Sequence, residues 1–364
     1  MRVDIVIAFW GNWHRRVFLE ACLPSLLSPR NLPALAARFP TRVVLYTTSR
    51  DMAEANAVPA LGALRSVAAV EFVPIDRRDL SDPLSAHARF WHLELDRAVG
   101  DDIVVLIPPD TVYSDGSLER LAQLLEAGKR CIFVPTLLRV VDTTFMPALR
   151  EEFQRDGIIA VPAATLVTLA MRHLHPWSAA QVKDSPYFTR HPEMVLWPVK
   201  GVGLLGHCLA THPFAVAPRL FPVENLKVRK FVDRVAQVHA VTDSEEMFAA
   251  SIAPLQNDFD WFSVPRRADP VMVGRWWTEF YSVANDQVAT EPFLIRFAQP
   301  ASGRLTRATG AARTFVNRAR AAREAYEVWR IALQLGCFQA AGVIAAALST
   351  GILWRVLATA SPRD

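Results

Sequence analysis

The stretch 102–116 reads DIVVLIPPDTVYSDG, and it is the part of the chain that decides the fold. Residues 103–107 form a continuous aliphatic run, which is the pattern required of a strand covered on both faces. Pro108 and Pro109 then end the ladder, because proline has no amide hydrogen to donate to a neighbouring strand. The sequence therefore predicts a buried strand that delivers Asp110 to the edge of an α/β sheet, where such sheets bind ligands.

Asp110 has two interpretations at this point. It can belong to a simple chain reversal, since Ser114, Asp115 and Gly116 follow and these residue types are typical of turns. It can also hold a divalent cation against a diphosphate, because hard oxygen ligands suit Mg²⁺ or Mn²⁺ and phosphate oxygens complete the shell. Both interpretations stay open.

The first 135 residues alternate between strand and helix patterns. A helix over 85–98 places Trp91, Leu95 and Ala98 on one face. Alternation of this kind predicts a parallel sheet with helices on its faces. The predicted strands are 3–9, 43–47, 70–74, 103–107 and 131–134, and the other helices are 18–27 and one that begins near residue 117.

Two common phosphate-binding motifs are missing after the first strand. The sequence there is Trp10-Gly11-Asn12-Trp13, without the Gly-x-Gly-x-x-Gly of a dinucleotide-binding turn. The glycine-rich loop and lysine of a P-loop are also missing. These differences exclude the dinucleotide fingerprint and most ATPase and kinase classes.

Composition indicates a globular protein in a reducing compartment. The 364 residues are 51% hydrophobic and 21% charged, which excludes global disorder and allows two or three structural units. The net charge of +4 does not suggest a nucleic-acid partner. The four cysteines form no Cys-x-x-Cys pair, which argues against a zinc site or a disulfide framework and favours the cytoplasm.

The second half is still mixed, but its strands are shorter. We expect a helix over 163–173, strands over 203–210 and 235–241, and a helix opening at Asp243. The predicted organisation has four parts: 1–135 as a ligand-binding half, 136–265 as a second half, 266–303 as a linker with an aromatic patch, and 304–364 as C-terminal helices.

The C-terminal segment is rich in arginine and then apolar. An apolar run over 331–354 is long enough to span a bilayer, and preceding arginines favour the cytoplasmic face and anionic lipid. Alternatively, these helices pack on the body of the protein or form a homo-oligomer contact. The arginines are Arg304, Arg307, Arg313, Arg318, Arg320, Arg323 and Arg330.

The alternation, the unusual loop after the first strand and the strand ending at Asp110 together resemble a GT-A nucleotide-diphospho-sugar transferase over residues 3–250. The type is glycosyltransferase family 2-like, as found with bacterial surface-polysaccharide genes. The resemblance implies a GT-A-like, mostly parallel sheet flanked by helices, with a C-terminal helical extension. Where the family has Asp-x-Asp, this chain has Pro108-Pro109-Asp110, so only the final carboxylate is present.

The resemblance also implies a donor site and a metal site. Each position has a plainer alternative as a core aromatic, a helix cap, a solvated helix face or a loop histidine. The implied donor residues are Trp10, Gly11, Asn12, Thr48, His87, Arg89, Asp110 and Asp115. The implied ligands of a Mn²⁺ or Mg²⁺ ion are Asp110, His207 and His212.

A transferase that inverts configuration also needs a base for the acceptor hydroxyl. Asp243, Glu245 and Asp184 are the candidates, with Glu193 in competition. Asp243 with Glu246 has the spacing of a capping box, so a helix terminus is the alternative.

The predicted function is transfer of a sugar from a nucleotide-sugar donor to a surface glycan or lipid-linked acceptor, at the inner face of the membrane. Two alternatives remain. One is a non-catalytic scaffold subunit of a polysaccharide assembly complex, which the incomplete Asp-x-Asp favours. The other is a sugar-nucleotidyltransferase, although the basic glycine-rich loop of that class is missing.

Overall fold

The fold is organised around a seven-stranded sheet in the order β15-β6-β12-β4-β1-β2-β3. All neighbouring pairs are parallel except those of β12, which runs antiparallel to β4 and β6. The predicted mostly parallel sheet is confirmed. Its strands are β1 Val3–Ala8, β2 Thr41–Thr47, β3 Ala69–Pro74, β4 Ile103–Leu106, β6 Cys131–Phe133, β12 Ala215–Val216 and β15 Val238–Ala240.

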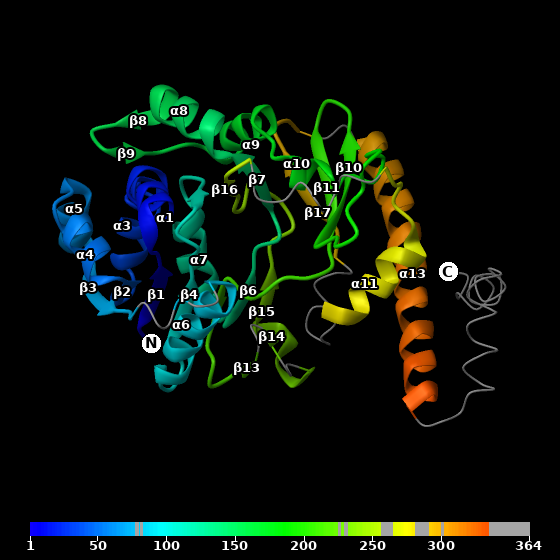
Figure 1. The fold of residues 1–364 in the computed structure, drawn as a ribbon, viewed down its shortest axis with the longest axis horizontal. Coiled ribbons are helices and arrows are strands. Elements are labelled where there is room, and N and C mark those ends of the chain that lie inside the picture. The colour runs from blue at the N-terminus through cyan, green and yellow to red at the C-terminus, as the bar shows by residue number, and fades with distance from the viewer. Residues whose placement is uncertain are drawn as a thin grey trace.

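This computed structural model describes residues 1–76, 80, 83–224, 227–228, 232–255, 265–280, 291–299 and 302–334. Figure 1 shows the seven-stranded sheet and its helices at one end of the molecule, and the C-terminal helices at the other.

Both faces of the sheet are covered, which is why its inner strands are mostly apolar on both faces. In β1, Ile5 and Ile7 belong to one buried cluster, whereas Val6 and Ala8 belong to the cluster on the opposite face. The covering helices are α1 Gly11–Val17, α2 Leu23–Leu26, α3 Leu32–Ala36, α4 Ser49–Asn56, α5 Pro59–Val67, α6 Pro83–Arg97 and α7 Ser117–Glu126. Alternate residues of a strand point to opposite faces, so two helical layers need an unbroken apolar run.

The first helix begins earlier than the predicted 18–27. Gly11, with a φ of 77°, turns the chain directly from β1 into α1. The helix continues through a π-helical segment, η1 Phe18–Cys22, into α2. Glycine adopts this left-handed conformation without the steric cost that other residues carry, so the turn can be this abrupt.

The second half builds two further three-stranded sheets and their helices. One has the order β5-β16-β7, and the other β10-β11-β17. Their strands are β5 Thr111–Tyr113, β7 Leu137–Val141, β16 Ala249–Ala253, β10 Met194–Val199, β11 Gly203–Cys208 and β17 Phe293–Arg296. The remaining elements are α8 Asp142–Phe153, β8 Gln154–Arg155, β9 Ile158–Ile159, α9 Ala163–Arg172, α10 Pro176–Ala179, β13 Val223–Glu224, β14 Lys227–Val228 and the 3-10 helix η3 Val232–Gln237.

One prediction for this half is wrong. The helix expected at Asp243 is a turn that leads into β16, because Asp243 is paired with Arg296 of β17 and the following residues complete a sheet. Residues 266–303 contain β17 and helix α11 Pro270–Phe280. The four-part division of the chain stays a prediction.

The C-terminal helix α13, Ser302–Gln334, packs on the body of the protein at the end opposite α4 and α5 (Figure 1). Phe315 meets the Trp197 ring edge-on at 5.7 Å. At Gly274 of α11, an added Cβ would lie only 2.2 Å from the Ala319 carbonyl oxygen, so glycine permits the close approach of the two helices. Residues 302–330 of α13 thus pack on the body of the protein, and the two alternatives for the apolar run after them stay predictions.

The apolar run over 331–354 falls largely outside the described residues, because the description of the chain ends at residue 334 and that of its side chains at residue 330. Within the described ranges, no helix combines the length and apolar character needed to cross a membrane.

Candidate active site

A cavity of about 660 Å³ lies where β1, β2 and β3 end. The carboxyl ends of parallel strands meet at one edge of a sheet, so the segments that follow them converge there. The volume falls within the range of small-molecule and cofactor sites. The lining residues are Trp10, Gly11, Asn12, Thr48, Ser49, Arg50, Asp51, Pro74, Ile75, Asp76 and Leu80.

Four predicted donor residues lie in this cavity: Trp10, Gly11, Asn12 and Thr48. Thr48 also caps α4, since its hydroxyl accepts the Asp51 amide hydrogen at 3.2 Å. Thr48 thus caps α4 and also lines the cavity, so its interpretation as a helix cap and its interpretation as a donor residue do not exclude each other.

Asp51 joins the loops that form the cavity. Its carboxylate accepts hydrogen bonds from the Gly11 amide at 2.9 Å and the Thr48 hydroxyl at 2.7 Å, and it forms an ion pair with Arg15. Burial raises the pKa of this carboxyl, but the bonds from Gly11, Thr48 and Arg15 outweigh burial and hold the pKa below its usual value. The Asp51 carboxylate therefore holds the start of α1 against the start of α4.

Asp110 lies at the same edge of the sheet as this cavity, at the point where the strand order reverses. The chain leaves β1 for β2 and β3 on one side, and returns to β4 on the other. The crevice at such a switch point is the usual ligand site of open α/β sheets. The prediction that the 103–107 strand delivers Asp110 to this edge is confirmed, and the Ile252 amide of β16 holds its carbonyl at 2.7 Å.

The Asp110 carboxylate is only partly exposed and interacts electrostatically with two basic groups, His14 of α1 and Arg139 of β7. Burial raises the pKa of Asp110, and the charges of His14 and Arg139 oppose that shift. Burial likewise lowers the pKa of His14, against the pull of Asp110. A hydrogen bond from the His14 ring to the Trp10 carbonyl connects the pair to the cavity wall.

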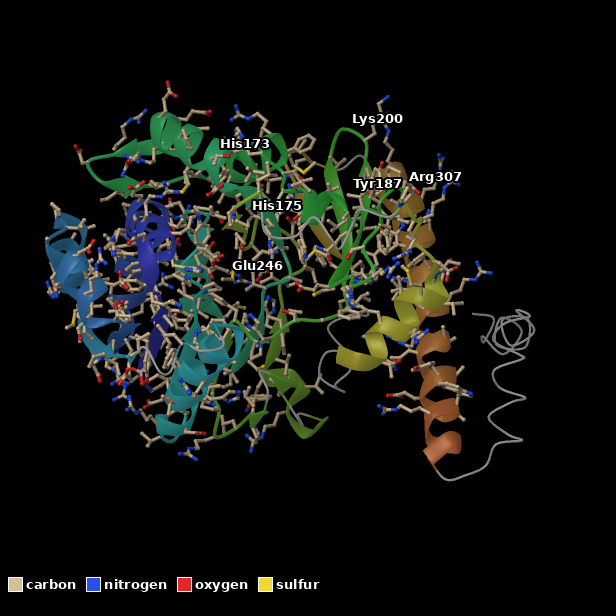
Figure 2. The ribbon with its side chains drawn as sticks, viewed as in Figure 1. His173, His175, Tyr187, Lys200, Glu246 and Arg307 are labelled. Carbon is tan, nitrogen blue, oxygen red and sulfur yellow. The ribbon has the colours of Figure 1, made fainter. Side chains whose placement is uncertain are left out.

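Arg139 is held rigidly in this site. Its guanidinium carbon stands 4.1 Å from the centre of the Trp177 ring, and its amide donates to the Ser178 hydroxyl at 2.8 Å. The amide of His175, which Figure 2 shows near the middle of the molecule, donates to the Arg139 carbonyl at 2.9 Å. A guanidinium stacked on an aromatic ring loses little further freedom when it binds an anion.

The remaining predicted donor residues lie elsewhere. Asp115 follows β5, and its carboxylate accepts the Arg30 amide hydrogen at 3.3 Å. Arg89 is an exposed residue of α6 whose guanidinium lies over the Phe90 ring at 5.4 Å. His87 is in α6, but its side chain lies outside the described part of the structure.

The predicted metal ligands are not assembled into one centre. His207 is a buried residue of β11 in a separate sheet, edge-on to Trp197. His212 does lie at the carboxyl edge, because β12 runs antiparallel to β4, but its ring is against Trp91 at 5.1 Å and its Nδ1 donates to the Pro213 carbonyl. In the described ranges, no three His, Cys, Asp or Glu side chains are grouped to hold an ion.

The predicted catalytic carboxylates are placed outside this site. The Asp243 carboxylate accepts Arg296 Nε–H at 2.9 and 2.8 Å, and it also accepts the Glu245 amide hydrogen at 2.9 Å. Glu245 is exposed, and Asp184 is an exposed partner of Lys183 at 3.0 Å. Glu193 is also exposed. None of the four lines the cavity beside Asp110.

Three residues of the site were not identified from sequence: His14, Arg139 and Asp51. Arg139 did leave a signal, because it is the single charge inside the apolar run 137–141. His14 lies one helical turn after Trp10, a position that becomes informative only when the helix is known to begin at Gly11.

No protein-family model matches the sequence, and no curated protein matches it. Among solved structures, a mannosyltransferase from Pyrobaculum calidifontis, in complex with GDP-Man and Mn²⁺, is similar over 99% of this chain and 81% of its own, with 15% identity and a TM-score of 0.35. TarS of S. aureus is similar over 38% of this chain, with 14% identity and a TM-score of 0.27. A glucose-1-phosphate thymidylyltransferase from Bacillus anthracis is similar over 38%, with 16% identity and a TM-score of 0.25. The matched regions span 22% of TarS and 56% of the thymidylyltransferase, and likenesses this weak do not assign a reaction.

Proposed function

We propose that this protein is a glycosyltransferase that binds a nucleotide-sugar donor across the cavity and Asp110. One observation carries the proposal: the first turn of α1, which lines the cavity at the ends of β1, β2 and β3, leads to His14, and His14 and Arg139 of β7 both interact electrostatically with Asp110 at the switch point. A nucleoside needs an enclosed pocket with a few polar groups, and a diphosphate needs cations beside it.

The cavity offers the chemistry that a nucleoside requires. Trp10 supplies an aromatic surface, whereas Asn12, Thr48 and Asp76 supply hydrogen-bond donors and acceptors for a base and a ribose. The diphosphate would then lie towards His14 and Arg139. Arg139 would supply the positive charge for the diphosphate. Asp110 would orient Arg139 and the neutral His14 imidazole and contact the sugar end of the donor.

In this reaction, the bond between the anomeric carbon and the diphosphate oxygen breaks, and a bond to the acceptor oxygen forms. The nucleoside diphosphate leaves with the electron pair, so Arg139 is placed to stabilise its developing charge. The acceptor hydroxyl must lose its proton, and the His14 imidazole, oriented by Asp110, is placed to accept it.

The family resemblance implies a divalent cation, but the residues beside Asp110 do not fit a resident one. Its charged neighbours His14 and Arg139 include a permanent cation, which opposes a second positive charge. No step of the mechanism is therefore assigned to a metal ion, and added Mn²⁺ is a variable of the test below.

The test is isothermal titration with UDP-glucose, GDP-mannose and a CMP-sugar, with and without Mn²⁺, followed by turnover of the donor that binds. We expect Asp110→Asn to lower turnover by about 100-fold, equivalent to about 2.7 kcal/mol, with an unchanged melting temperature. Asp115→Asn is the matched control, because that carboxylate faces the Arg30 amide instead. Absence of nucleotide binding, or equal turnover in the Asp110 variant, would refute the assignment.

The same experiment separates the alternatives. Nucleotide binding without turnover in any acceptor screen favours the scaffold subunit. Release of pyrophosphate from a nucleoside triphosphate and a sugar 1-phosphate favours the sugar-nucleotidyltransferase. Hydrolysis or transfer of the donor sugar supports the glycosyltransferase.

We further propose contact with an anionic membrane surface through α13. Arg304, Arg307, Arg313 and Arg318 are all exposed, and Figure 2 shows Arg307 on the outer side of this helix. Arginines near an anionic leaflet contribute about 1 kcal/mol each. Replacing these four by Gln should abolish sedimentation with phosphatidylglycerol vesicles at low salt, and equal sedimentation of the variant and the original would contradict the contact.

A further inference from the structure

A second cavity of about 660 Å³ lies between the first helix and α8, and the proposed donor site does not use it. The first helix forms a wall of both cavities: Gly11 and Asn12 line the donor cavity, and Arg16 and Glu20 line this one. The wall from α8 contains a buried carboxylate, two aliphatic side chains and several polar ones. These lining residues are Asp142, Thr143, Met146, Pro147, Arg150, Glu151 and Gln154.

Trp13 connects this second cavity to the reacting end of the donor site. Its Nε1 donates to the Asp142 carboxylate at 2.9 Å, and its ring meets the His14 imidazole edge-on at 4.7 Å. His14 in turn interacts electrostatically with Asp110. The route from Asp142 through Trp13 to His14 thus connects the second cavity with the group that we propose accepts the acceptor's proton.

The lining suits a polyhydroxylated ligand. Glu20 and Arg150 form an ion pair at 2.9 Å that joins the two walls, and both side chains are partly exposed to the cavity. Carboxylates accept and guanidinium groups donate hydrogen bonds, which together match the hydroxyls of a sugar ring. Met146 and Pro147 add an apolar surface for the C–H face of the ring.

The charge of the lining argues against a phosphorylated ligand. Two positive residues, Arg16 and Arg150, are set against three negative ones, Glu20, Asp142 and Glu151. The formal charge is therefore −1, and the innermost group is the Asp142 carboxylate, whose side chain is 6% exposed. A lipid diphosphate would meet net repulsion here, whereas a neutral saccharide would not.

We propose that the cavity between the first helix and α8 binds the acceptor, as a neutral saccharide and not as a lipid diphosphate. This inference rests on the proposed glycosyltransferase function. The acceptor hydroxyl lies towards Trp13 and His14, its oxygen bonds to the anomeric carbon as the diphosphate leaves, and its proton passes to the His14 imidazole. Asp142 is a positioning residue, since it holds the Trp13 indole and accepts a hydrogen bond from the saccharide.

The test is saturation-transfer NMR of the full chain with methyl glucoside, galactose and N-acetylglucosamine as probes, in the presence and absence of UDP and GDP. Farnesyl diphosphate is the lipid-diphosphate probe. We expect at least one neutral saccharide to receive saturation from the protein, and farnesyl diphosphate to leave that signal unchanged. No transfer to any saccharide, or displacement by farnesyl diphosphate, would overturn the proposal.

Variants locate the site. Arg150→Gln should weaken saccharide binding by about tenfold, since one charged hydrogen-bond donor is lost. Arg155→Gln is the matched control, because Arg155 does not line the cavity and its guanidinium bonds to nearby backbone carbonyls. Met146→Trp, which fills the cavity, should abolish the signal, and its melting curve shows whether it folds. Saccharide binding that is equal in the Arg150 and Arg155 variants overturns the proposal.

Nucleotide titration separates this inference from the one on which it rests. Loss of saccharide binding with retained nucleotide binding in Arg150→Gln supports two distinct subsites. If no nucleotide binds to the unmodified protein but the saccharide signal still depends on Arg150, the donor assignment fails and the saccharide site stands.

Discussion

The two ends of the central sheet both carry buried charges, but they use them differently. At the amino end, Asp4 of β1 receives bonds from Arg42 of β2 at 3.0 and 2.9 Å. Arg42 also bonds to Glu94 of α6, which accepts the Tyr46 hydroxyl at 2.6 Å. The hydrogen bond from Arg42 to Asp4 raises the pKa of the guanidinium, and burial raises that of Tyr46. These groups satisfy one another and fasten α6 to the sheet.

At the carboxyl end, the corresponding groups are left partly open. Asp110, His14 and Arg139 interact electrostatically, yet Asp110 keeps part of its surface exposed beside a cavity. The contrast teaches that residue type does not distinguish a structural ion cluster from a ligand site. The distinction lies in whether the protein itself uses all the hydrogen-bonding capacity of the charged groups.

The largest expected effect comes from disrupting the charge cluster at the amino end of the sheet. Asp4→Ala leaves the Arg42 guanidinium without its main partner in a buried environment, and should lower the free energy of unfolding by about 3 kcal/mol. Urea denaturation measures this change. Asp101→Ala is the control, since that exposed carboxylate forms only long ion pairs, at 3.7 and 4.0 Å, and should cost under about 1 kcal/mol. Equal losses in the free energy of unfolding of the Asp4 and Asp101 variants would show that the charge cluster at the amino end does not stabilise the fold more than an exposed ion pair does.

A smaller effect is expected at the carboxyl end of the sheet. Arg139→Lys keeps the charge but loses the planar group that stacks on Trp177, so donor binding should weaken by about tenfold, or about 1.4 kcal/mol. The melting temperature should change little, because we expect Arg139 to bind the donor and to contribute little to the stability of the fold. Titration calorimetry and a melting curve measure the two quantities. A large fall in melting temperature with unchanged donor affinity would make Arg139 a structural residue like Arg42.

The smallest effect concerns acid stability at a third charge cluster, around Glu246, which Figure 2 shows near the middle of the molecule. Burial raises the pKa of this carboxyl, but bonds from His239 at 2.7 Å and Arg120 at 2.9 Å outweigh burial and lower it. The stabilisation is therefore present above the unfolded pKa of about 4.3 and is lost as pH falls through the lower folded value.

Glu246→Gln should accordingly cost about 1 kcal/mol at pH 7 and progressively less as the pH falls below the unfolded pKa, because the unfolded carboxyl of the original protein then becomes protonated. Denaturation at pH 7 and at pH 3 measures the difference. A cost that is independent of pH would show that the charge of Glu246 does not stabilise the fold.

Much of the fold could be predicted from local patterns. Helices cover both faces of the strands that end before Trp10 and Asp110, so these strands are mostly apolar on both faces, with Asp4 as the exception in β1, and that pattern is visible in the sequence. The helix expected at Asp243 does not form. Asp243 and Glu246 have the spacing of a capping box, but the pairing of Asp243 with Arg296, 53 residues away, directs the chain into β16 instead.

The sequence by itself therefore determined the parallel sheet and the strand that ends at Asp110. Through the family resemblance it also pointed to Trp10, Gly11, Asn12 and Thr48, which follow strand ends and line the cavity. Only the tertiary structure brought His14 and Arg139 to Asp110 and separated His207 from it. The physical reason is that strand ends are encoded by local burial and turn chemistry. The partners of a buried charge are chosen by sheet order and β-strand register, which connect residues far apart in the chain.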